Sequence, residues 1–276
     1  MSSSFYRVGG SLLALSLLGI GCSPSAGPTA PTSTTTPSSR VGSPAAVGTV
    51  ESAGSLILPT APTGSASCDH PYYPLRSGYV VRYQASGGGA PVSHYRSEVT
   101  DVRPGAATLK AYFDSGLEVG QTYACQPGGA LLATAYVEMP TAGRRANLIT
   151  RSSEGPYLPA DFQVGSRWTQ RFETLARTEA GSDEAKMPDL QMLITITHEA
   201  VAEELVTVPA GSYRAIKVKS IMKANVASAD APLVGEGSVF AQSTEWWVRG
   251  VGLVKTQADS PSASAMTVEA EAVTIP

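Results

Sequence analysis

The stretches Ile194-Thr195-Ile196-Thr197 and Ile216-Lys217-Val218-Lys219 decide the fold of this chain. Each places apolar side chains at every second position, with polar side chains between them. Successive side chains of a strand point to opposite faces of its sheet, so this period predicts strands with one packed and one wetted face. Similar segments rich in β-branched and aromatic residues recur from Tyr79 to Gln257. They predict a mainly β, antiparallel fold.

Turns rich in glycine and proline separate these segments. The clearest are Gly87-Gly88-Gly89, Val208-Pro209-Ala210-Gly211 and Gly250-Val251-Gly252. Short turns between strands favour hairpins, so we expect curved antiparallel sheets of half-barrel or sandwich-like form. The best helical candidate runs from Phe172 to Met187, and an excursion loop is the alternative there.

A weak internal duplication suggests two similar β halves. The segment from Tyr73 to Gly78 precedes a predicted strand, and Leu158-Pro159 with Val164-Gly165 precedes another. A polar link near Gly143-Arg144-Arg145 separates the halves. We therefore predict a first β subdomain over 67–140 and a second over 147–276, forming two domains or one larger structure.

The chain begins like a secretory signal. Arg7 supplies a positive charge, the apolar core runs from Leu12 to Ile20, and Gly21-Cys22 follows. A bilayer-spanning helix needs about 20 apolar residues, which is more than this core offers. The pattern predicts a signal peptide over 1–21 that is removed on export.

The segment Leu18-Gly19-Ile20-Gly21-Cys22 resembles the lipobox of bacterial lipoproteins, with Gly19 at the place where leucine is preferred. The resemblance implies a thioether-linked diacylglyceryl group on Cys22 and further palmitate-type acylation. Two or three acyl chains give a stable membrane anchor. Ser23, in place of aspartate, resembles the sorting pattern for the outer membrane. The alternative is an ordinary secretory signal that contains a cysteine.

The segment 22–66 is dominated by Ser, Thr, Pro, Ala and Gly, and its only charges are Arg40 and Glu51. Such a composition buries too little apolar surface to offset chain entropy. It predicts a lipidated, disordered linker that spaces the folded part from the membrane.

Two cysteines remain after Cys22, namely Cys68 and Cys125. In an exported protein an even pair is most simply a disulfide. Free thiols, or a metal site at Cys68-Asp69-His70, are the alternatives. The formal net charge of −3 gives no indication of a nucleic-acid partner.

The second half resembles uncharacterised bacterial exported proteins of the DUF3108 type of periplasmic β domain. The resemblance rests on Pro209-Ala210-Gly211, the strand Ala215 to Val218, the strand Glu245 to Val248, and Gly250-Val251-Gly252-Leu253-Val254-Lys255. It implies a fold related to the half-barrels of the lipoprotein-carrier group. No catalytic residues are defined for such proteins.

The search for chemistry gives no catalytic, metal or cofactor residue. His198-Glu199 lacks the second histidine of a zinc-protease helix. Ser220-Ile221-Met222-Lys223 matches Ser-x-x-Lys but lies in an alternating strand without the companion motifs.

Five aromatic residues are candidates either for the core or for a ligand face. They are Trp168, Trp246, Trp247, Tyr83 and Tyr123. Neighbours in a strand point to opposite faces. We therefore expect at most one of Trp246 and Trp247 in the core, with the other facing outward or into a second layer.

These observations favour a non-catalytic, membrane-anchored lipoprotein of the cell envelope with a β domain for binding or scaffolding. Its expected partners are the membrane, through the acyl chains, and an envelope protein. We expect it at the outer membrane, facing the periplasm or the cell surface. One alternative is a carrier of a lipid or other hydrophobic ligand. The second is an envelope hydrolase whose site is assembled from distant residues.

Overall fold

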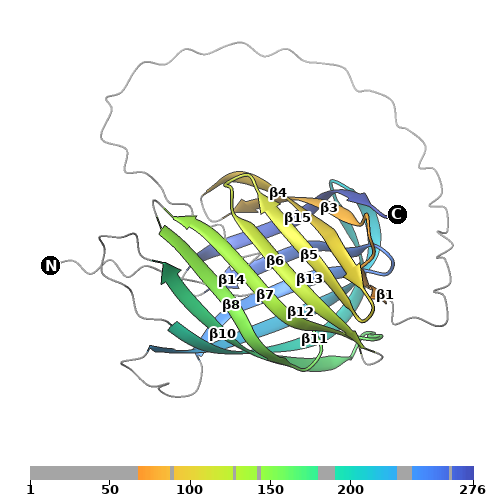
Figure 1. The fold of residues 1–276 in the computed structure, drawn as a ribbon. Coiled ribbons are helices and arrows are strands. Elements are labelled where there is room, and N and C mark those ends of the chain that lie inside the picture. Colours follow the sequence, from red (N-terminus) through yellow and green to blue (C-terminus); the bar gives the residue numbers. More distant parts are fainter. Residues whose placement is uncertain are drawn as a thin grey trace, which may run out of the picture.

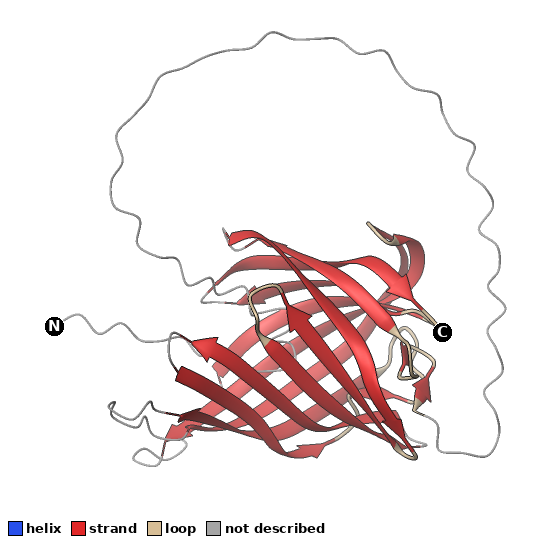
Figure 2. Cartoon of the chain, turned by 45° about the horizontal axis from the view of Figure 1, so that its top comes forward, coloured by secondary structure: helices blue, strands red, loops and turns tan. Residues whose placement is uncertain are grey.

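The computed structural model describes residues 68–87, 90–126, 129–141, 144–179, 190–228, 238–260 and 263–276. Every regular element in these ranges is a β-strand (Figures 1 and 2). The predicted signal peptide 1–21, the lipidation site Cys22 and the linker 22–66 lie outside the described residues. Within the described ranges, no helix has the length and apolar character needed to cross a membrane.

Thirteen strands of the described residues form one antiparallel sheet, and two short strands form a separate pair. The pair is β1 (Asp69–His70) and β2 (Tyr73–Pro74). The strands of the sheet are β3 (Val80–Gly87), β4 (Ala90–Arg103), β5 (Ala106–Phe113), β6 (Glu118–Gln126), β7 (Gly129–Thr141), β8 (Arg144–Glu154), β9 (Leu158–Pro159), β10 (Arg167–Glu179), β11 (Leu190–Val208), β12 (Gly211–Ser228), β13 (Ser238–Val248), β14 (Gly252–Ser260) and β15 (Ala263–Thr274).

The long strands follow one another as a meander. Each pairs with the next long strand in the sequence, and β15 also pairs with β3. Figure 1 shows the resulting curved sheet, in which β5 to β8 lie across from β11 to β14. This confirms the predicted mainly β fold of curved antiparallel sheets, and the described residues are β throughout their regular elements.

The predicted link between the two halves lies inside the sheet. β7 pairs with β8 from Tyr136↔Ile149 to Thr141↔Arg144. Both predicted subdomains, 67–140 and 147–276, therefore contribute strands to the same sheet.

The proposed helix from Phe172 is wrong for its described part, because β10 continues to Glu179. Backbone pairing on both sides holds this segment extended, with β8 on one side and β11 on the other. Phe172 and Thr174 are buried on the same face. The tertiary pairing outweighs the helical propensity of the sequence.

The alternation of apolar and polar residues in 194–197 and 216–219 is visible in the burial of their side chains. Ile194, Ile196 and Val218 are buried, whereas Thr197 and Lys219 are exposed. We call the face that carries the buried side chains the inner face, and the opposite one the outer face.

The segment from Cys68 to Tyr79 packs against one end of the sheet. The amide of Gly250 donates to the carbonyl of Pro71 over 2.6 Å. The rings of Tyr72 and Phe162 lie 4.3 Å apart. Gly252 has a φ of 110°, and a Cβ there would collide with the Tyr79 hydroxyl. The glycine turn predicted from the sequence thus makes room for this packing.

Candidate functional site

Cys68 and Cys125 form a disulfide, with their Cα atoms 5.0 Å apart. It joins the first described residue to β6. His70, the other member of the alternative metal site, uses both ring nitrogens locally. Its Nδ1 accepts from the Tyr72 amide at 3.1 Å, and its Nε2 donates to the Pro159 carbonyl at 2.6 Å. The disulfide prediction is confirmed, and the metal and free-thiol alternatives are wrong for these cysteines.

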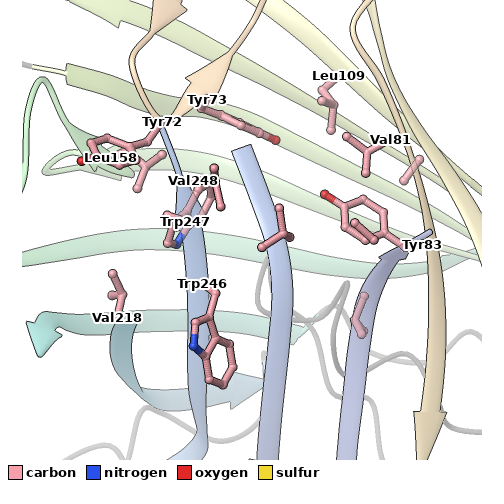
Figure 3. Close-up of a cluster of buried hydrophobic side chains, with 14 of the residues drawn as sticks. Tyr72, Tyr73, Val81, Tyr83, Leu109, Leu158, Val218, Trp246, Trp247 and Val248 are labelled. Atoms are coloured by element: carbon pink, nitrogen blue, oxygen red, sulfur yellow. The ribbon is translucent and has the colours of Figure 1, made fainter. Parts of the chain in front are cut away.

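Four aromatic rings gather at the same end of the molecule. They belong to Tyr73, Tyr123, Tyr157 and Trp247, and we call them the aromatic cluster. Their centroids lie 5.4 to 6.2 Å apart, with edge-on contacts of Tyr73 to both Tyr123 and Trp247. Such edge-to-face pairs are favourable beyond their buried area. Figure 3 shows Tyr73 and Trp247 within this buried region.

The five predicted aromatic residues do not share one surface. Tyr123 and Trp247 belong to the aromatic cluster. Tyr83 stacks on Tyr95 with a centroid distance of 4.9 Å, and its hydroxyl donates to the Leu253 carbonyl. Trp168 stacks on His198, also at 4.9 Å.

Trp246 lies on the outer face, although it is buried like Trp247. Its register partners are Lys217 and Lys255, and their ammonium groups lie 5.3 and 5.7 Å from its ring. Its Nε1 donates to Glu204 over 2.7 Å. Charged side chains therefore form a second layer over this ring, and Trp247 alone of the two lies on the inner face. Both rings nevertheless belong to the buried hydrophobic cluster, so the expectation of at most one core tryptophan is wrong, because the lysine stems shield the outward ring from solvent.

A row of polar side chains crosses the inner face of β10 to β13. Register pairs Trp168 with His198, His198 with Ser220, and Ser220 with Ser243. The Nδ1 of His198 lies 2.7 Å from the Ser220 Oγ. We call these four residues the polar row. Burial lowers the pKa of His198 to about 4, so the ring is neutral at pH 7.

Several polar atoms on this wall of the sheet have no hydrogen-bond partner. Within the described part of the chain they are both amide atoms of Gln170, the hydroxyls of Ser153, Thr174 and Ser243, and His198 Nε2. Register places all of these residues on the inner face, because their partners there include Ile196, Phe172 and Met192. Buried polar atoms are normally paired, so each unpaired one marks a place where a partner is missing.

Glu245 lies beside the polar row on β13. Along the strand it stands between Ser243 and Trp247, and its register partners are the buried Val218 and Thr256. Its Oε2 accepts a hydrogen bond from Trp247 Nε1 over 2.9 Å. Burial raises the pKa of Glu245 to about 7, against the lowering effects of this bond and of the Ser243 hydroxyl, which lies near the carboxyl although the two groups lack good hydrogen-bond geometry.

The His198–Ser220 contact bears on the hydrolase alternative. A serine nucleophile needs a histidine base that a third group orients, and it must be reachable by substrate. Here the second ring nitrogen, Nε2, has no partner, and Ser220 is 1% exposed. The geometry is that of a buried cross-strand pair.

A hollow of about 800 Å³ runs across β10 to β13. Its lining includes the buried side chains of the polar row and the largely exposed residues that alternate with them. Of the five predicted aromatic residues, only Trp168 contributes to it. Its lining is otherwise mainly polar, unlike the apolar cavity that a lipid carrier needs. The lining residues are Arg167, Trp168, Thr169, Thr197, His198, Glu199, Lys219, Ser220, Ile221, Gln242, Ser243 and Thr244.

Sequence reasoning did not single out Glu245, Ser243 or Gln170. A signal for Glu245 was present, because alternation back from Trp247 puts residues 245 and 243 on the same face as that tryptophan. An acidic residue at such a position is unusual in a core. Gln170 carried the same signal, because alternation puts it on the face of Trp168 and Phe172, and its register partner is the buried Ile196.

Two solved structures resemble this chain. One is a candidate lipoprotein from Parabacteroides distasonis, with 16% identity and a TM-score of 0.45, and the match covers 74% of this chain and 99% of that one. The other is a candidate exported protein with YmcC-like fold from Bacteroides fragilis, with 12% identity and a TM-score of 0.40, covering 75% and 100%. Likenesses at this level carry no argument about function.

No family model and no curated protein matches the chain. The resemblance to the DUF3108 type therefore stays a prediction.

Proposed function

We propose that this protein is exported, anchored to the bacterial cell envelope by acyl chains on Cys22, and active as a binding or scaffolding domain. The observation that carries the proposal is the Cys68–Cys125 disulfide. Disulfides persist in oxidising compartments and are rare in the cytosol. This bond is independent of the signal-like N-terminus, and both features indicate the same side of the inner membrane.

The place of the disulfide suits a tethered domain. Cys68 lies two residues after the end of the proposed linker 22–66, so the bond fastens the chain to β6 close to where the linker joins the fold. Force on the linker then reaches the sheet through a covalent bond. We propose the outer membrane as the site of anchoring, on the basis of Ser23 after Cys22, and an envelope protein as the partner.

Binding is favoured over catalysis by the state of the one histidine–serine contact among the described residues. His198 and Ser220 are both buried, and the unpaired atoms around them are hydrogen-bonding groups of neutral side chains. Such groups can hold a molecule in place without a reachable nucleophile.

The test of the anchor is metabolic labelling with palmitate in a bacterial host that carries the lipoprotein pathway. The wild-type chain is expected to incorporate label and to sediment with membranes. Cys22→Ala is expected to lose both properties, and Cys68→Ser serves as the control that keeps the label. Equal labelling of Cys22→Ala and wild type would refute the anchor.

A further inference from the structure

The hollow across β10 to β13 lies on the outer face of the sheet. Two rows of outer-face side chains line it, and the polar row between them forms its floor. The inner-face residues on either side of the polar row, such as Val218 and Ile196, would line a hollow on the inner face, and they do not line this one. The two outer rows are Arg167, Glu199, Lys219 and Thr244, and Thr169, Thr197, Ile221 and Gln242.

Lys219 supplies the unbalanced charge of this hollow. The charged side chains of the lining are two cations and one carboxylate, Glu199. Glu199 already pairs with Arg167 over 2.6 Å. Other lysines of the sheet pair with a glutamate, as Lys217 does with Glu204, whereas Lys219 makes no ion pair within the described ranges. The hollow therefore carries an excess of one positive charge at an exposed side chain.

The hydroxyl groups of the hollow are open to a ligand. Thr169 and Thr197 are register partners, and no hydrogen bond joins their side chains. By contrast, the register partners Thr207 and Ser212 have hydroxyls 2.9 Å apart. The Thr244 hydroxyl likewise makes no side-chain hydrogen bond to a residue that the structure describes. A hydroxyl both donates and accepts hydrogen bonds, so these groups can serve a polar molecule in the hollow.

Two of these hydroxyls lie within reach of a molecule that contacts Lys219. Thr244 is the register partner of Lys219, and partners directly opposite each other have Cβ atoms about 4.5 to 5.5 Å apart. Thr197 is a diagonal neighbour, because its register partner Ile221 lies two residues beyond Lys219. Diagonal neighbours lie about 7 to 8 Å apart. A charged molecule with a short carbon chain spans these distances.

We propose that this hollow binds a small anion that carries hydroxyl groups, such as a hydroxylated carboxylate or phosphate ester. Its anionic group pairs with Lys219, and its hydroxyls meet Thr197 and Thr244. The proposal rests on the binding role given above and is independent of the anchor at Cys22. A metal cation fits less well, because no three His, Cys, Asp or Glu side chains of the described ranges come together.

The test is calorimetric titration of the full chain in uncharged detergent with glycerate and glycerol 3-phosphate, and glycerol is the neutral probe. At least one anion is expected to bind, and Lys219→Gln is expected to weaken it about tenfold, which corresponds to the loss of one charged hydrogen bond. Glu199→Gln is expected to tighten binding, because it removes a negative charge and releases Arg167. Lys223→Gln is the matched control, since Lys223 lies on the same strand and face but outside the hollow, and it keeps wild-type affinity.

A second measurement uses the wild-type chain and so does not depend on a variant that folds. The NMR signals of Thr197 and Thr244 are expected to shift when the anion is added, while that of Thr207 stays in place. Micelles that contain phosphatidylglycerol distinguish a lipid headgroup from a free ester, since only a headgroup ligand shifts these signals there. Three results overturn the proposal: no response to either anion or to the lipid, unchanged affinity in Lys219→Gln, or weaker binding in Glu199→Gln. Any of them, with Cys22 still acylated, refutes the site and leaves the anchor standing.

Discussion

The aromatic cluster and the polar row lie on the same inner face, yet they treat buried polar groups in opposite ways. Around the cluster, donors have partners: Tyr79 donates to the Val251 carbonyl, Tyr83 to that of Leu253, and Trp247 to Glu245. In the polar row and beside it, His198 Nε2, Ser243 and Gln170 have none.

This difference in hydrogen bonding distinguishes the part of the fold that supplies stability from the part that is free to bind. A satisfied polar group inside a packed cluster contributes to a unique core, whereas an unpaired one costs free energy until something pairs with it. We infer that the disulfide-closed aromatic end holds the fold together. The polar row together with Ser153, Gln170 and Thr174, which we call the polar wall, is then the part adapted to another molecule. Four predictions test this comparison.

The largest effect is expected for Trp247→Ala. Trp247 is the largest of the fully buried side chains. Removing such a ring costs about 3 to 5 kcal/mol, and Glu245 also loses the hydrogen bond from Trp247 Nε1. We expect a loss of about 5 kcal/mol, the top of that range, in the free energy of unfolding in urea.

Trp246→Ala is the matched control for this change. Its ring lies outside the inner face beneath two lysine side chains, so its truncation is expected to cost about half as much. Equal losses for the two tryptophans would show that the inner core does not dominate stability.

The second effect concerns the disulfide. Cys68 and Cys125 are 57 residues apart in sequence, and closing a loop of that size stabilises a fold by about 4 kcal/mol on the chain-entropy model. We expect the double variant Cys68→Ser/Cys125→Ser to lose about 2 to 4 kcal/mol in the same urea titration.

Reduction of the wild-type chain should reproduce that loss, and reduction of the double variant should change nothing. A wild-type protein whose two cysteines react with an alkylating agent before reduction would contradict the bond itself.

The third effect is the pH dependence that Glu245 imposes. Its pKa rises from 4.5 unfolded to about 7 folded, so the contribution of the protonated acid is complete below pH 4.5 and is lost as the pH rises to 7. His198 acts in the opposite sense. Its pKa falls from 6.5 to about 4, so its contribution is complete above pH 6.5 and is lost as the pH falls to 4.

Glu245→Gln is therefore expected to be more stable than wild type at pH 8. The full shift corresponds to about 3 kcal/mol, and partial exposure of the side chain reduces our expectation to about 2 kcal/mol. At pH 4 the advantage should vanish. Thermal unfolding across this pH range measures both, and a constant difference at all pH values would assign the effect to packing instead.

The sequence predicts the disulfide-closed aromatic end, where buried donors have hydrogen-bond partners, better than it predicts the polar wall. An even cysteine pair in an exported chain is a local and general signal, and it found the bond between Cys68 and Cys125. Alternation likewise placed Ile194, Ile196 and Val218 on one face. Both signals depend on residue type and spacing alone.

The polar wall depends on register, which the sequence does not show. β-bulges shift the pairing between Met222 and Lys223 and between Trp246 and Trp247. One residue of slippage would turn a strand's inner side chains outward. The meeting of His198 with Ser220, and of Glu245 with Thr256, follows only once these registers are known.

The smallest effect, and the sharpest contrast with Trp247, is expected for Ser243→Ala. Ser243 is buried, and its hydroxyl makes no hydrogen bond of good geometry although it lies near the Glu245 carboxyl. Its removal therefore ends a desolvation cost and leaves only a small void. We expect a change within about 1 kcal/mol, with stabilisation the more frequent outcome for such a group. Ser220→Ala is the control, since it takes the partner from His198 Nδ1 and should cost about 1 to 2 kcal/mol.

These two serines are register partners on neighbouring strands and differ chiefly in whether the hydroxyl is paired. If Ser243→Ala costs as much as Ser220→Ala, the Ser243 hydroxyl has a partner in solution, and the polar wall is as satisfied as the aromatic end. If Ser243→Ala is neutral or stabilising while Ser220→Ala is costly, the fold does not use the Ser243 hydroxyl, and the polar wall differs from the aromatic end in how its buried polar groups are paired.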